Sequence, residues 1–152
     1  MRAREIMTRE VTSLSPDSSI REAMELLEQK EISGLPVVDR DGKFLGMLTE
    51  KEILSSILPS YIGKVGRFIY EQNPKSTKKK LGEIAHLKVA QLMRKEAITT
   101  TEDVTLCEIA HIMLVNKSRR IPVLDKSGKM LGIVTRGDVL AAFEKVAAGI
   151  DK

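Results

Sequence analysis

A threonine, an arginine and an aspartate close the segment GIVTRGD (residues 132–138). A carboxylate accepts hydrogen bonds on both oxygens, so Asp138 is able to bridge two vicinal hydroxyl groups. A helix that begins near Arg136 would add an anion site, because free N–H groups point outward at a helix N-terminus. Thr135 and Arg136 could then meet a phosphate. The plainer alternative is that Asp138 only stabilises the first helical turn and that Thr135 is its N-cap.

The same frame occurs 86 residues earlier as GMLTEKE (residues 46–52), where the last residue is glutamate. Glu52 is one methylene longer than aspartate, which displaces its carboxylate by about 1 Å in an otherwise unchanged pocket. Glu50 also replaces the arginine of the other frame, and its charge would repel a phosphate. We therefore expect Thr49 and Glu52 to mark a second site that is weaker, altered or vacant.

The frame belongs to a longer internal repeat. When the chain is shifted by 86 residues, 13 positions between Met7 and Leu54 are identical to their partners without a gap. Repetition at this scale indicates two copies of one supersecondary unit, each too small to bury its sheet face alone.

Each copy predicts the order β-α-β-β-α, so the fold class is α/β, or α+β. Ile20, Ala23 and Leu27 recur at helical spacing, after a serine N-cap at 18 or 19. Strands are expected at 35–39 and 44–49, and at 121–125 and 130–135, with an Asp-Gly or Ser-Gly turn inside each pair. Closing helices should begin near Glu50 and Arg136.

Residues 59–88 interrupt the repetition, so the predicted organisation is 1–58, 59–88 and 89–152. Within and after the insertion we expect a short helix at 61–72, a basic loop at 74–80 and one helix at 81–93. Its aromatic residues would form a small satellite core.

Composition limits the remaining possibilities. The chain has 152 residues, a net charge of +4, no Trp and one cysteine, Cys107, which we expect to be a buried thiol. One Cys and two His leave little for a zinc site, and no apolar run reaches the ~20 residues of a membrane span. We expect a cytoplasmic protein without a catalytic metal or a nucleophile–base pair.

The segments ISGLPVVD and SRRIPVLD, each followed by a turn glycine and by the frame above, resemble the CBS-domain family in its tandem form, the Bateman module. The resemblance covers about 3–55 and 89–145. It implies two CBS repeats packed about a pseudo-twofold axis, and a binding module instead of an enzyme. Its expected ligands are adenosine compounds (AMP, ADP, ATP or S-adenosylmethionine), bound in clefts between the repeats. A homodimer in the form of a flat disk and an unidentified regulated protein are further expectations.

The resemblance also assigns roles to particular residues. Asp138 would accept hydrogen bonds from the ribose, supported by Thr135 and Arg136, and Arg119 and Arg120 would meet phosphate. The residues expected to cradle the base or support the ribose are Ser15, Ser33, Gly34, Leu35, Pro36, Thr99, Thr101, Ile121 and Pro122. Sequence alone does not assign Arg119 and Arg120 to one cleft.

Two other functions stay open. A nucleic-acid-associated regulator would use the lysines of the insertion, although they lack interleaved aromatics and we expect no nucleic-acid partner. A purely structural dimerisation module would leave its clefts empty.

Overall fold

The computed structural model describes residues 1–57 and 74–149. They form two compact units. Unit 1 comprises Met1–Thr12, Val38–Phe44 and Glu96–Lys152, and unit 2 comprises Ser13–Val37 and Leu45–Lys95. The leading segment of each repeat, Met1–Thr12 or residues 89–95, therefore packs with the other repeat, and the turn of the first hairpin is counted with unit 1.

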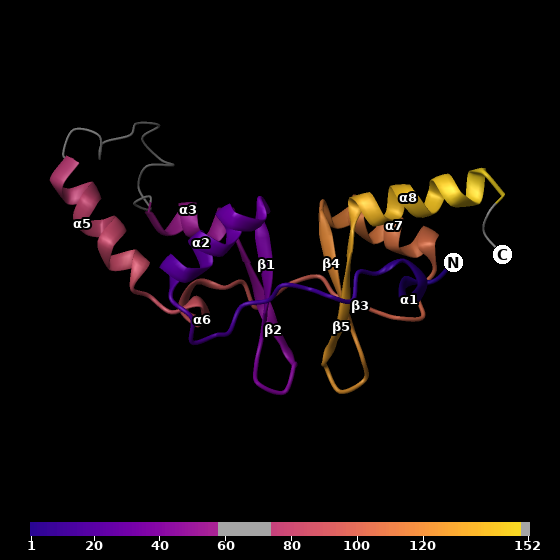
Figure 1. Ribbon diagram of the computed structural model, residues 1–152, viewed down its shortest axis with the longest axis horizontal. Coiled ribbons are helices and arrows are strands. Elements are labelled where there is room, and N and C mark those ends of the chain that lie inside the picture. The colour runs from indigo at the N-terminus through magenta and orange to yellow at the C-terminus, as the bar shows by residue number, and fades with distance from the viewer. Residues whose placement is uncertain (58–73, 150–152) are drawn as a thin grey trace. The chain divides into compact units, whose positions relative to one another are not determined.

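Unit 1 is built on a three-stranded sheet in the order β3-β4-β5 (Figure 1). β3 (Thr100–Thr101) runs parallel to β4 (Arg120–Leu124), which pairs antiparallel with β5 (Met130–Thr135). Helices α7 (Leu106–Asn116) and α8 (Arg136–Ala147) follow β3 and β5.

The core of unit 1 follows from the spacing of its apolar residues. Leu106, Ile109 and Met113 lie on one side of α7 and are buried against strand residues such as Val123. The N-terminal helix α1 (Ala3–Ile6) joins this core through Ala3, which is fully buried.

Unit 2 repeats the plan with β1 (Gly34–Val38), β2 (Phe44–Thr49), α2 (Ile20–Lys30) and α3 (Glu50–Ile57). Its core gathers residues from these elements and from α5 (Pro74–Ala85) and α6 (Val89–Leu92). The buried members are Leu14, Ile20, Ala23, Leu27, Leu35, Val37, Leu48, Ile53, Ile84 and Val89.

The predicted mixed fold and most element positions are confirmed. Ser19 is the N-cap of α2 and accepts a hydrogen bond from the Glu22 N–H. Both turn glycines have a positive φ, 82° at Gly42 and 90° at Gly128, as tight hairpin turns require. The extended piece before α2 forms only one bridge, Leu14 to Val37, where unit 1 has the strand β3.

The hairpin turn of unit 1 is fixed by an aspartate. Asp125 Oδ1 accepts hydrogen bonds from the Ser127 hydroxyl at 2.7 Å and from the Lys129 N–H at 3.0 Å. These donors, the Ser127 hydroxyl first, hold the pKa of Asp125 below its ordinary value.

Three sequence predictions were wrong. Residues 74–80 begin α5 instead of forming a loop, and Pro74 suits a first helical turn, where its missing N–H costs nothing. The predicted helix 81–93 is broken between α5 and α6, because the Leu87 carbonyl accepts from the Ile20 N–H and the Ser18 carbonyl accepts from the Val89 N–H. Cys107 is exposed, because it lies off the buried stripe of α7.

The predicted helix at 61–72 lies outside the described residues. Among the described helices none is long and apolar enough to cross a membrane. The described residues also hold no cluster of three His, Cys, Asp or Glu side chains that could bind a metal ion.

Candidate functional site

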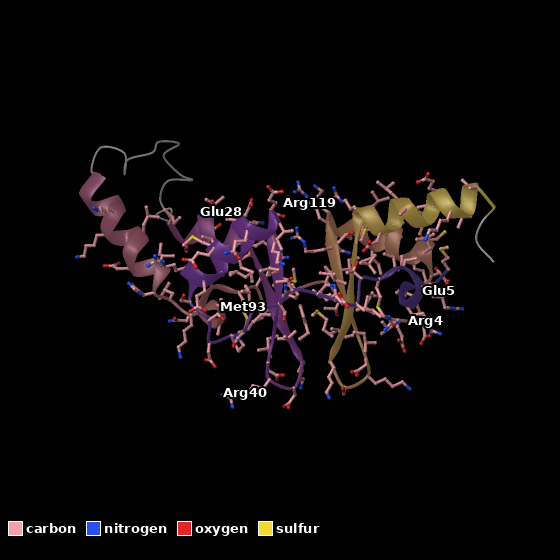
Figure 2. All side chains as sticks on the ribbon, viewed as in Figure 1. Arg4, Glu5, Glu28, Arg40, Met93 and Arg119 are labelled. Carbon is pink, nitrogen blue, oxygen red and sulfur yellow. The ribbon has the colours of Figure 1, made fainter. Side chains whose placement is uncertain are left out.

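Five of the predicted site residues meet at one end of the β4–β5 hairpin of unit 1. Arg120 pairs with Thr135 in the strand register, and the Arg136 N–H donates to the Arg119 carbonyl at 3.1 Å. Asp138 follows in the first turn of α8. Figure 2 shows Arg119 at the end of the hairpin from which α8 starts. The structure thus places Arg119 and Arg120, at the start of β4, in the same unit as Asp138.

Thr135 and Asp138 form a reciprocal cap at the start of α8. The Thr135 N–H donates to Asp138 Oδ2 at 2.9 Å, and the Asp138 N–H donates to the Thr135 hydroxyl oxygen at 3.2 Å. This is the capping box that the plainer interpretation expected. The cap uses only one carboxylate oxygen, since no donor within the described residues reaches Asp138 Oδ1. An acceptor therefore remains for a ligand hydroxyl.

The Thr135 hydroxyl is also available as a donor. It accepts from the Asp138 N–H, and nothing within residues 1–57 and 74–149 accepts its proton. Both Thr135 and Asp138 are half-buried, so a hydrogen bond to a ligand would be partly shielded from water.

The aligned cap of unit 2 has a different hydrogen-bond pattern. Glu52 Oε1 accepts from the Thr49 N–H at 2.8 Å and also from the Thr49 hydroxyl at 2.7 Å. The extra methylene of Glu52 lets the carboxylate reach the hydroxyl. In unit 2 the hydroxyl of Thr49, which aligns with Thr135, therefore already donates to Glu52 and is not available to a ligand.

Charge separates the two sites further. In unit 1 the end of the hairpin that leads into α8 carries Arg119, Arg120 and Arg136. At the aligned positions unit 2 has Ser33, Gly34 and Glu50, and the Glu50 N–H donates to the Ser33 carbonyl as its counterpart does in unit 1. Coulomb interactions therefore favour an anion in unit 1 and oppose one in unit 2.

The other predicted residues fall into two groups. Thr101 pairs with Leu124, four residues along β4 from Arg120, which at about 3.3 Å per residue puts it at the far end of the strand. Ser15 holds the aligned place in unit 2, where its hydroxyl oxygen accepts from the Asp17 N–H at 3.3 Å. Within unit 1, Thr101 lies away from Asp138, whereas Thr99, half-buried, precedes β3 and is nearer to it.

The four apolar strand residues are buried. Leu35 is 2% exposed and Ile121 is fully buried, so only their backbone could meet a ligand. The Pro36 carbonyl accepts from the Leu14 N–H at 2.9 Å and is therefore used by the fold. Pro122 is the aligned residue in β4 and is likewise buried.

Sequence reasoning missed Thr8. Its hydroxyl donates to Asp138 Oδ2 at 3.5 Å across 130 residues of sequence. The Thr8 backbone bridges Ile133 through two hydrogen bonds of 2.9 Å. The repeated identity of Met7 and Met93 was the available signal, because it marks the segment that docks on each hairpin.

The frame's first glycine makes that docking possible. A Cβ on Gly132 would lie 2.6 Å from the Thr8 carbonyl oxygen, and a Cβ on Gly46 would lie 2.6 Å from the Arg94 carbonyl oxygen. Only glycine permits so close a backbone approach without a shift of the neighbour. The frame thus combines a docking glycine, a capping threonine and an acid.

Known proteins resemble the chain over nearly its whole length. The chloroplastic CBS domain-containing protein CBSX1 of Arabidopsis thaliana is 30% identical over 91% of this chain, which spans 61% of that protein. Uncharacterized protein MJ1426 of Methanocaldococcus jannaschii is 31% identical over 84% of this chain and 82% of its own length.

A solved structure agrees in fold. The crystal structure of CBSX2 in complex with AMP, from the same plant, matches with a TM-score of 0.74 and 27% identity over 96% of this chain and 98% of that one. The family model for the CBS domain matches residues 3–59 and 89–145. The chain therefore belongs to the CBS-domain family and carries two repeats of it.

Proposed function

We propose that the protein is a non-catalytic regulatory module that binds an adenine nucleotide at the arginine-lined end of unit 1. The observation that carries this proposal is the Thr135–Asp138 cap. Among the described residues, it leaves Asp138 Oδ1 without a donor and the proton of the Thr135 hydroxyl without an acceptor. A ribose offers vicinal hydroxyls that match a carboxylate oxygen and a hydroxyl donor. The AMP bound in the CBSX2 crystal structure supports this class of ligand.

The charges favour a phosphorylated ligand. Arg119, Arg120 and Arg136 suit AMP, ADP or ATP, whereas the sulfonium cation of S-adenosylmethionine would be repelled. A longer phosphate chain can contact more of these arginines. We therefore expect binding affinity to rise from AMP to ATP. Unit 2, with Glu50 and Glu52, should bind the same ligands more weakly or not at all.

Calorimetric titration with AMP, ADP, ATP, S-adenosylmethionine and NAD tests the proposal. Asp138→Asn keeps an oxygen for the Thr135 N–H but removes the charge, so nucleotide affinity should fall at least tenfold. Glu52→Gln is the matched control and should leave the main site unchanged. The proposal is wrong if no adenosine compound binds, or if Asp138→Asn binds as tightly as the wild type.

Regulation requires that the nucleotide bind two arrangements of the module with different affinity, since otherwise it shifts nothing. Within the proposal, the module responds to adenylate levels in the cytoplasm and passes the change to a regulated protein. The two CBS repeats and the AMP complex of CBSX2 support such a sensor.

We further propose that the protein forms a homodimer through the outer face of α7 and α8. Leu114 is 79% exposed, Val115 64% and Leu140 69%. Residues 28 and 29 of α2, which align with 114 and 115, are Glu and Gln, and Figure 2 labels Glu28. A helix that is apolar on both sides is normally covered on both sides. A second copy can cover this face symmetrically.

Sedimentation velocity tests the dimer. Leu114→Glu places a charge in the proposed interface and should give a monomer at concentrations where the wild type is a dimer. Gln29→Glu makes a comparable change at the aligned surface of α2 and should leave the dimer intact. A monomeric wild type, or a Leu114→Glu protein that still dimerises, would exclude this interface.

A further inference from the structure

We propose that Thr8, in the leading segment of the first repeat, is a positioning residue for Asp138, an inference that rests on the proposed nucleotide site. The Thr8 hydroxyl donates to Asp138 Oδ2, the same oxygen that accepts from the Thr135 N–H. Two donors on one carboxylate oxygen fix the rotation of the group. The other oxygen, Oδ1, is thereby turned away from the cap and towards a ligand.

The backbone that carries the Thr8 hydroxyl is held firmly against β5. Its backbone N–H and carbonyl both bond to Ile133 at 2.9 Å, and Met7 beside it is only 8% exposed. A Cβ on Gly132 would meet the Thr8 carbonyl oxygen at 2.6 Å and Met7 Sδ at 3.0 Å, so the segment sits tightly on β5. At 3.5 Å the hydroxyl contact is long for an O–H donor, and its effect is directional more than stabilising.

Unit 2 shows what happens without such a hydroxyl. Arg94 occupies the aligned place and makes the same bridge, with backbone hydrogen bonds to Met47 of 2.8 and 3.0 Å. Glu52 there takes its second hydrogen bond from the Thr49 hydroxyl. In unit 1, Thr8 supplies that second donor from outside the cap, and the Thr135 hydroxyl stays available to the ligand. The residue at position 8 or 94 therefore helps to decide whether the hydroxyl of the capping threonine donates to the acid of the cap or to the nucleotide.

The test compares Thr8→Val, which keeps the shape but removes the donor, with Thr8→Ser, which keeps the donor. AMP affinity is measured by calorimetry on the full chain, and the melting temperature is measured without nucleotide. We expect Thr8→Val to weaken AMP binding about fivefold, because a carboxylate that is no longer held in place makes a poorer hydrogen bond to the ligand, and to leave the melting temperature unchanged. Thr8→Ser should bind AMP within about twofold of the wild type, since it retains that hydrogen bond.

Two controls separate this inference from the proposed function. In an Asp138→Asn background, Thr8→Val should cause no further loss, because the residue acts through the carboxylate. Arg94→Val alters the aligned position of unit 2 and should leave AMP binding at unit 1 unchanged.

Either of two outcomes would overturn the positioning role: wild-type AMP affinity in Thr8→Val while Asp138→Asn loses binding, or an equal loss in Thr8→Ser and Thr8→Val accompanied by a lower melting temperature. The first leaves the proposed function standing. Unchanged binding in Asp138→Asn itself would instead refute the proposed function.

Discussion

Replacing Asp138 by glutamate would copy the cap of unit 2 into unit 1. In unit 2, Glu52 Oε1 takes both the N–H and the hydroxyl of Thr49, at 2.8 and 2.7 Å. A glutamate at 138 should fold back in the same way and take the Thr135 hydroxyl from the ligand. Loss of one hydrogen bond between the neutral Thr135 hydroxyl and the ribose costs about 0.5–1.5 kcal/mol, which corresponds to roughly 2- to 13-fold weaker nucleotide binding.

The same substitution should leave stability almost unchanged, because glutamate still accepts from the Thr135 N–H and stays at the positive end of α8. Asp138→Ala removes both the cap and the charge, so it should weaken binding and also lower the free energy of unfolding by about 0.5–2 kcal/mol. Titration calorimetry and scanning calorimetry on the two variants separate the roles. The reasoning fails if Asp138→Glu binds AMP like the wild type, or if its stability falls as far as that of Asp138→Ala.

Three further predictions follow from single contacts. Gly132→Ala should destabilise the protein by about 1–3 kcal/mol in chemical denaturation, because its Cβ would lie 2.6 Å from the Thr8 carbonyl oxygen; wild-type stability would mean that the docked segment moves away freely. Arg119→Gln should weaken ATP binding more than AMP binding and reduce its salt dependence in titrations, and equal losses for both would show that this arginine does not meet the phosphate chain. Cys107 is exposed on α7, so a thiol reagent should label it in the native protein at concentrations low enough to keep the protein monomeric; a thiol that is labelled only after denaturation would contradict its exposure.

Local patterns predicted the elements well because their signals are local. The helical spacing of Ile20, Ala23 and Leu27 and the glycines of the two hairpin turns depend on neighbours a few residues away. The prediction failed where a distant segment intervened. Leu87 ends a helical pattern because its carbonyl is needed at the start of α2, 67 residues earlier in the chain.

The candidate site was predictable in part. Thr135 and Asp138 carry a spacing that already implies a cap, and the structure adds which oxygen the cap leaves for a ligand. The difference between Asp138 and Glu52 was visible as one methylene, but its consequence for the Thr49 hydroxyl depends on side-chain geometry. The repeated Met7 and Met93 mark the docking segment, but no sequence pattern shows that the Thr8 side chain within it reaches Asp138, 130 positions along the chain.

Each repeat packs its leading segment into the core of the other repeat, and this affects both the stability of fragments of the chain and the way the duplication could have arisen. A fragment of residues 1–58 would hold Ala3 and Met7 with no core to receive them, and it would lack Val89, which is fully buried in unit 2. Neither copy contains the whole of its own core, so an isolated copy should be less stable than the full chain. An ancestor with a single copy could have completed its core by inserting its leading segment into a second molecule. Duplication would then have turned an intermolecular partnership into a covalent one.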